Sequence, residues 1–172
     1  MRAIGLPKII LFYACMSATG LIALFGRDDL QLLLPSWRWL SWGQTVFLGV
    51  ALGLLLVGLS RVLVSQFRWA QGLQTELKAA IGELSHHQVL VIAILSGIGE
   101  ELLFRGVIHQ ALGLYLGAAV FGLMHIGPNA RFLPWPILAF GVGLLLGGLL
   151  ELTGNLLAPM LVHGLVNYLN LR

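Results

Sequence analysis

The chain has 172 residues, of which 58% are hydrophobic and only 10% are charged, and its mean hydropathy is +0.91. Soluble domains are about 45–50% apolar and about 25% charged, so this composition argues against a soluble fold and predicts a membrane protein. The net charge of +3 comes from scattered basic residues, which form no nucleic-acid-binding stripe, and the single cysteine, Cys15, excludes an internal disulfide framework.

The amino-terminal half contains two predicted membrane spans and one water-facing segment. A helix needs about 20 mostly apolar residues to cross the bilayer, and the ranges 6–25 and 44–64 meet this requirement. We interpret the first as an uncleaved span, because no small-residue cleavage site follows it. Between them, the short range 30–42 is rich in tryptophan, which favours the membrane interface. Its tryptophans are Trp37, Trp39 and Trp42.

The range 65–87 carries several charges between apolar residues spaced three and four apart. This pattern predicts an amphipathic helix. It lies either on the membrane surface or in water as a connecting helix. The pattern does not decide between the two.

The carboxy-terminal half predicts four further spans, over 88–112, 113–126, 135–152 and 155–171. The Gly-Pro pair that follows the fourth is a strong helix breaker, and the glycines of the fifth permit close helix packing. The expected fold is therefore all-α, a polytopic membrane bundle of about six transmembrane helices. We expect a single membrane-embedded domain over residues 1–172.

The basic residues predict the orientation of the bundle. With the amino terminus in the cytoplasm, most lysines and arginines fall on the cytoplasmic side, as the positive-inside rule requires. The cytoplasmic set is Arg2, Lys8, Arg61, Arg68, Lys78, Arg131 and Arg172, against Arg27 and Arg38 outside. We therefore expect both termini in the cytoplasm. The membrane expected is a prokaryotic plasma (inner) membrane.

The third span contains three charged residues, each of which costs at least about 2.5–3.5 kcal/mol inside a bilayer and so needs a partner or a function. Glu101 and Arg105 are four residues apart on one helix face and can pair. Glu100 points about 100° away from Glu101 and has no partner on its own helix. Glu100 is therefore the candidate for chemistry.

Two later spans offer polar side chains that Glu100 can face. His125 ends the fourth span, and His163 and Asn167 lie four apart on one face of the sixth. A carboxylate, two imidazoles and a carboxamide in a low-dielectric cavity would form a hydrolytic site, with Glu100 as general base and His163 and Asn167 as oxyanion donors. Each residue alone is also consistent with a packing role, and we assign His86 and His87 to solvent. His109 could lie near the site, although a packing role is favoured.

These residues fall into three motifs that resemble those of the CPBP family, which comprises CAAX proteases and bacteriocin-processing enzymes. Residues 100–105 (EELLFR) resemble the EExxxR motif, residues 121–125 (FGLMH) the FxxxH motif, and residues 163–167 (HGLVN) the HxxxN motif. The three occur in the family's order, and the resemblance covers about 88–171. It implies an abi-type helical bundle with its site recessed in the membrane.

The resemblance implies an intramembrane endopeptidase of the glutamic type. Glu100 and His125 would activate water, and His163 and Asn167 would form the oxyanion hole. The supporting residues would be Glu101, Arg105 and Phe121. The substrate would be a membrane-anchored, lipidated or sorting-signal-bearing protein.

Metal dependence stays open at this point. Metal-free catalysis without a cofactor is favoured, but Glu100, His125 and His163 would be the ligands of a zinc ion if one takes part. Two other functions remain. One is a non-catalytic immunity or scaffold protein of the same fold. The other is a proton-coupled transporter with Glu100 as relay, which the lack of internal repeats disfavours.

Overall fold

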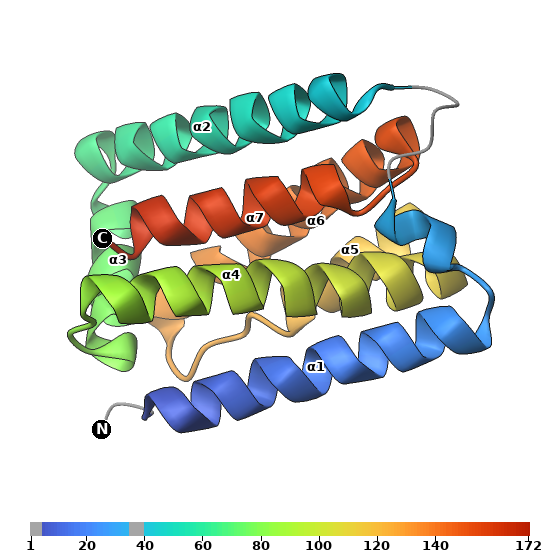
Figure 1. The fold of residues 1–172 in the computed structure, drawn as a ribbon. Helices are drawn as coiled ribbons and strands as arrows, with labels where there is room; N and C mark the ends of the chain where they lie inside the picture. The colour runs from blue at the N-terminus through green and yellow to red at the C-terminus, as the bar shows by residue number, and fades with distance from the viewer. Residues whose placement is uncertain (1–4, 35–39) are drawn as a thin grey trace.

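The computed structural model describes residues 5–34 and 40–172 of the chain. Within these residues it contains seven α-helices and no strand, which confirms the all-α prediction (Figure 1). The α-helices are α1 (Leu6–Gly26), α2 (Trp42–Gln66), α3 (Arg68–Ile81), α4 (His86–Leu103), α5 (His109–Leu123), α6 (Pro134–Thr153) and α7 (Leu157–Asn170). Shorter elements are the 3₁₀ turns η1 (Leu30–Leu33) and η3 (Ala130–Phe132) and the π-helical segment η2 (Phe104–Ile108).

The helices follow the predicted spans closely. The expected third span is α4, which continues through η2 into the first turn of α5 and ends at Gly113. The φ of Gly113 is +78°, a value that glycine adopts without steric cost, so the chain can reverse there. Three helical stretches are long and apolar enough to cross a membrane: Leu6–Gly26, Trp42–Gln66 and Ala130–Thr153. The predicted interfacial residues Trp37 and Trp39 lie outside the described residues.

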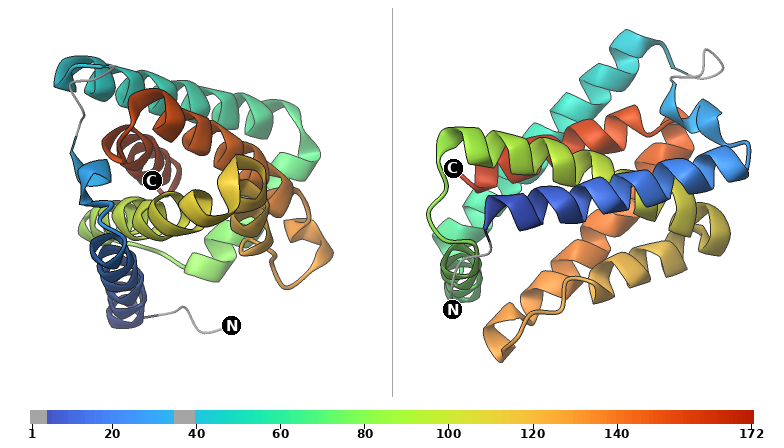
Figure 2. Two further views of the ribbon diagram at one scale, coloured as in Figure 1. Left: turned by 90° about the vertical axis from the view of Figure 1, so that its right-hand side faces the viewer. Right: turned by 60° about the horizontal axis from the view of Figure 1, so that its bottom comes forward.

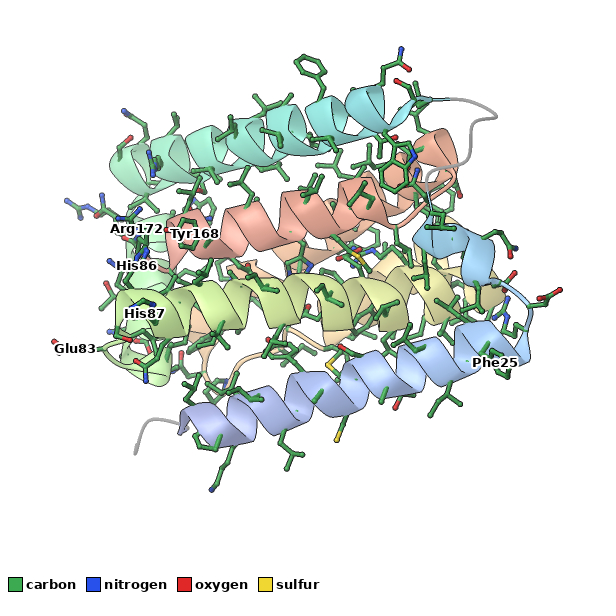
Figure 3. The ribbon with its side chains drawn as sticks, in the orientation of Figure 1. Phe25, Glu83, His86, His87, Tyr168 and Arg172 are labelled. Atoms are coloured by element: carbon green, nitrogen blue, oxygen red, sulfur yellow. The ribbon has the colours of Figure 1, made fainter. Side chains whose placement is uncertain are left out.

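Four helices lie side by side in one layer, in the order α1, α4, α7, α2, and α5 and α6 pack together behind them (Figures 1 and 2). Helix α3 crosses one end of this bundle, the end at which α1 begins and α7 finishes. Figure 3 shows His86, His87, Tyr168 and Arg172 at that end and Phe25 at the opposite one. His86 and His87 are exposed, as predicted.

Local sequence explains where two of the bundle helices begin. Ser41 precedes α2 and Ser85 precedes α4, and each accepts a hydrogen bond from the backbone N–H three residues later. The side-chain oxygens of the glutamines at those positions, Gln44 and Gln88, accept a hydrogen bond from the serine backbone N–H in return. These reciprocal capping boxes satisfy N–H groups that a helix start leaves unpaired. They fix the start of α4 about four turns before its glutamates.

Glycines set how closely α4 packs against its neighbours. A Cβ atom at Gly97 would lie 2.9 Å from the backbone nitrogen of Gly164 and 3.2 Å from the carbonyl oxygen of Met160, both on α7. Backbone atoms cannot move aside as a flexible side chain can. The absence of a side chain at Gly97 therefore allows α4 and α7 to touch, as small residues do in membrane helix pairs.

Replacing Gly97 with alanine is expected to destabilise the protein by about 1–3 kcal/mol, because the added methyl group overpacks the α4–α7 contact. Gly148 on α6 is the matched control, since a Cβ there meets nothing within 4 Å. Gly148→Ala should leave stability unchanged or slightly higher, because alanine is the better helix former. Unfolding in mixed detergent micelles measures the free energy of unfolding of both variants. Equal stability of the two would contradict this packing argument.

Helix α3 is amphipathic, as predicted: Ala70 and Leu73 are buried, whereas Arg68 is exposed. A polar contact also ties α3 to the turn before α6. Arg131 Nη1 donates to Glu76 Oε1 at 2.9 Å, and Asn129 Nδ2 donates to Glu76 Oε2 at 3.3 Å. The hydrogen bonds from Arg131 and then Asn129 lower the pKa of Glu76 below its ordinary value of 4.5.

This lowered pKa predicts a pH-dependent attachment of α3. A carboxyl group whose folded pKa is depressed contributes stability above its unfolded pKa, and the contribution is lost as the pH falls through the folded value. Hydrogen exchange of the α3 amides, corrected for intrinsic rates, should therefore increase below about pH 4.5 in the wild type. In Glu76→Gln, which cannot titrate, protection should not change across this range. A wild-type profile as flat as that of the variant would count against the contact.

Candidate active site

A buried ion pair lies at the end of α4. Arg105 Nη1 donates to Glu101 Oε1 at 2.9 Å, and the two side chains are 3% and 0% exposed. The Arg105 guanidinium lies 4.2 Å from the centre of the Phe121 ring, and its Nη2 donates to the carbonyl oxygen of Gly143 at 3.5 Å. The predicted pairing is thus confirmed. Through Arg105 it also connects α4 with α5 and α6.

Arg105 is part of the π-helical segment η2, which interrupts the helix three residues after Glu101. The Arg105 carbonyl oxygen accepts a hydrogen bond from the Gln110 side chain at 3.3 Å. Single π turns inside α-helices are frequent at functional sites. No feature of the sequence pattern indicated this turn.

Glu100 lies on a different side of α4 from the ion pair and has no partner on its own helix, as predicted. Two neighbouring helices contact it instead. The Tyr13 hydroxyl of α1 donates to Oε1 at 3.2 Å, and His163 Nε2 of α7 lies 3.7 Å from Oε2. The Glu100 side chain is 12% exposed. It is therefore a nearly buried carboxylate between a neutral donor and an imidazole.

His163 connects the two carboxylates. Its Nδ1 lies 2.6 Å from Glu101 Oε1, while its Nε2 faces Glu100. A carboxylate only accepts hydrogen bonds, so Nδ1 carries the proton in this contact. The ring is thus oriented by Glu101 with its other nitrogen directed at Glu100.

Asn167 lies one turn after His163 on the same helix, and it is part of a separate contact. Its Nδ2 donates to the Ser96 hydroxyl at 2.8 Å, and Ser96 is fully buried one turn before Glu100. The amide nitrogen has a second hydrogen that this bond does not use. Asn167 therefore lies beside the cluster, and its second amide hydrogen has no hydrogen-bond partner among the residues that the structure describes.

His125 follows the end of α5, at the edge of the cluster. Its Nδ1 lies 2.7 Å from the carbonyl oxygen of Phe121. The centre of its ring lies 4.5 Å from the centre of the Phe121 ring and 5.1 Å from that of Trp135. The carbonyl accepts, so Nδ1 donates and Nε2 of the neutral ring is left as a proton acceptor. In the part of the chain that the structure describes, His125 has no hydrogen bond or ion pair with Glu100. Phe121 links the two sides, since its ring centre is 6.2 Å from that of His163.

The arrangement does not fit the three-ligand zinc site considered from the sequence. Among residues 5–34 and 40–172, no group of three histidine, cysteine or acidic side chains is close enough to hold a metal ion. Glu100 and His163 approach each other, but His125 is turned toward its own helix and Trp135. Glu100 and His163 alone would give a metal ion two protein ligands, fewer than the three of a catalytic zinc site.

Three features of the site were not predicted from the sequence. Tyr13 and Ser96 hydrogen-bond to predicted site residues, and the Gly143 carbonyl accepts from Arg105. A hydroxyl inside an apolar span is a weak signal, and it does not indicate which helix lies opposite. His109, for which a packing role was favoured, is directed elsewhere, with Nε2 3.3 Å from Glu151.

Comparison with known proteins identifies the half of the chain that holds most of these residues. One family model matches residues 83–169. It describes the Rce1-like family as "Type II CAAX prenyl endopeptidase Rce1-like". The uncharacterized protein YpbD of Bacillus subtilis (strain 168) is 30% identical over 90 residues, which are 52% of this chain and 47% of YpbD. The chain thus aligns with about half the length of this relative. No solved structure matches at a significant level.

Replacing Arg105 with methionine is expected to destabilise the protein by about 3–5 kcal/mol, because Glu101 would be left as an uncompensated buried charge. The exposed pair of Arg27 and Asp29, at 3.1 Å with side chains 39% and 25% exposed, provides the matched control. Arg27→Met should change stability by at most about 1 kcal/mol. Unfolding in detergent measures the stability of both variants. Similar losses of stability in the two would show that burial of the ion pair does not determine the cost of breaking it.

Proposed function

We propose that this chain, which belongs to the Rce1-like family of type II CAAX prenyl endopeptidases, is an intramembrane peptidase with Glu100 as its general base. One observation carries the proposal. Of two adjacent buried glutamates, Glu101 is neutralised by Arg105, whereas the partners of Glu100 among the described residues are a tyrosine hydroxyl and an imidazole. A nearly buried carboxylate without a cationic arginine partner is suited to accept a proton from water.

In the proposed first step, Glu100 takes a proton from a water molecule whose oxygen attacks the carbonyl carbon of the scissile peptide bond. His125 is assigned to the same step, because its Nε2 is left as a proton acceptor and its ring shares Phe121 with His163. The attack gives a tetrahedral intermediate with a negatively charged oxygen. Asn167 would donate a hydrogen bond to that oxygen, and so would His163 Nε2 when its ring is protonated at both nitrogens, since the Nδ1 proton is bound to Glu101.

In the second step, the carbon–nitrogen bond breaks, and Glu100 returns its proton to the departing amine. One water molecule and one peptide bond are consumed, and one carboxylic acid and one amine are formed. Glu101 and Arg105 act by orienting His163 and transfer no proton in this scheme. Asn167 can serve while it is bound to Ser96, because that bond uses only one of its two amide hydrogens.

The proposed substrate is a membrane-anchored, lipidated or sorting-signal-bearing protein whose cleavage site enters the bilayer. The cluster is formed by apolar helices, which favours a substrate that is already in the membrane. We further propose a prokaryotic plasma-membrane location with both termini in the cytoplasm. The bundle end crossed by α3 supports this orientation because it holds many of the basic residues. They include Arg61, Arg68, Lys78, Arg131 and Arg172.

A non-catalytic scaffold or immunity protein of the same fold is the second candidate. One observation favours it: within the described ranges, His125 does not contact Glu100, and binding a peptide requires no such contact. The two functions differ in a single measurable outcome, the appearance of new peptide termini.

The Glu100→Gln variant is expected to lose peptide cleavage at least 100-fold, the scale of a general base, because the amide cannot accept a proton. The probe is a quenched fluorescent farnesylated CAAX peptide, presented to the full chain in lipid vesicles. In parallel, membrane-protein termini are compared between cells with equal levels of wild type and variant. The control is Glu83→Gln, which changes an exposed carboxylate at the bundle end (Figure 3) and should cleave normally.

Cleavage of both the peptide and cellular proteins that survives Glu100→Gln would overturn the assignment of the base. Identical termini with wild type and variant, together with no cleavage of the probe, would favour the scaffold. Cleavage of the prenylated probe but not of its unprenylated counterpart would assign the lipidated substrate class. Cleavage of both would favour a peptide signal instead.

A further inference from the structure

We infer that Tyr13 is a positioning residue for Glu100, an inference that rests on the proposed function. Tyr13 lies on α1, outside the residues 83–169 that carry the family match. Its hydroxyl donates to Glu100 Oε1 at 3.2 Å. A helix outside the matched region thus supplies one contact to the proposed catalytic carboxylate.

The hydroxyl makes the two oxygens of Glu100 different. Oε1 accepts from Tyr13, while Oε2 is 3.7 Å from His163 Nε2, beyond direct hydrogen-bonding distance. Tyrosine is unionised at neutral pH, so its hydroxyl donates to the ionised carboxylate without adding charge. The contact holds the carboxylate plane and leaves Oε2 as the oxygen available for the proton of the attacking water.

Glycines on α4 and α1 allow the two helices to approach closely enough for Tyr13 to reach Glu100. A Cβ atom at Gly99 would lie 3.1 Å from the Tyr13 carbonyl oxygen and 3.1 Å from the Ser17 hydroxyl, so glycine lets the α1 backbone approach. One turn along, a Cβ at Gly20 of α1 would lie 2.7 Å from that of Leu102. These two close contacts lie on either side of Glu100 in the sequence of α4. They hold α1 where the Tyr13 hydroxyl reaches the carboxylate.

The charged groups around Glu100 act differently from Tyr13. His163 faces Glu100 from α7. Glu101 accepts hydrogen bonds from both His163 and Arg105, so this pair affects Glu100 by orienting the His163 ring. The influence of His163 depends on its own protonation. The Tyr13 hydroxyl is unionised across the neutral and acidic range, so its removal should disturb the position of the Glu100 carboxylate without adding or removing a charge.

The test is an infrared spectrum of the Glu100 carboxylate band, recorded at one neutral pH with the full chain in lipid vesicles. The band is assigned by its loss in Glu100→Gln. A hydrogen bond to one oxygen makes the two carbon–oxygen bonds of a carboxylate unequal, so Tyr13→Phe should shift the frequency of the band. Tyr115→Phe is the matched control, because Tyr115 is 72% exposed on α5 and should leave the frequency unchanged. An unchanged frequency in Tyr13→Phe overturns the inference.

A second variant tests the close approach of α1. Gly99→Ala keeps the hydroxyl but pushes α1 away, so it should shift the carboxylate band in the same direction as Tyr13→Phe. An unchanged band in Gly99→Ala would show that this contact does not set the hydrogen bond. Helical content measured by circular dichroism confirms that both variants are folded.

Kinetics with the farnesylated CAAX peptide separate this inference from the proposed function. Tyr13→Phe should reduce kcat about tenfold with little change in KM, because the carboxylate is misplaced while the peptide still binds. An unchanged kcat would contradict a positioning role. Failure of the wild type to cleave any probe or cellular protein would reject the proposed function, whereas the infrared spectrum would still decide whether Tyr13 holds Glu100.

Discussion

The need to neutralise charge inside an apolar bundle determines the arrangement of this protein. Glu101 and Arg105 are almost completely buried, and removing two charges from water costs several kcal/mol per ion unless their geometry and hydrogen bonds compensate. Each therefore takes partners from other helices: His163 for Glu101, and the Phe121 ring and the Gly143 carbonyl for Arg105. The pair thereby ties α4 to α5, α6 and α7.

The same requirement separates the roles of two adjacent glutamates. Successive residues of a helix point about 100° apart, so only one of the two can share a face with Arg105. Glu101 takes that position and becomes part of the framework. Glu100 is left with partners that carry no fixed positive charge, and this difference in surroundings is what a division between a structural and a reactive carboxylate requires.

The sequence predicts the helices and the Glu101–Arg105 pair because both depend on local spacing. Apolar runs of sufficient length define the spans, and a separation of four residues brings two side chains together within one helix. Local spacing does not predict which side chains of different helices meet. Tyr13 lies 87 residues from Glu100, and nothing in the pattern of 6–25 indicates that its hydroxyl faces α4. The turn of His125 toward Trp135 likewise depends on how α5 and α6 meet, and the roles of the site residues stay a prediction.

A short segment of α4 nevertheless contains most of the information that builds the site. Gly97 faces α7 and Gly99 faces α1, so each glycine admits one neighbouring helix, while Ile98 between them is 39% exposed. The helix admitted by Gly97 carries His163 next to Gly164, and the helix admitted by Gly99 carries Tyr13. These two side chains contact the two oxygens of Glu100, which follows directly in the sequence. The glycines that permit close packing are therefore also the residues that determine which groups surround the carboxylate.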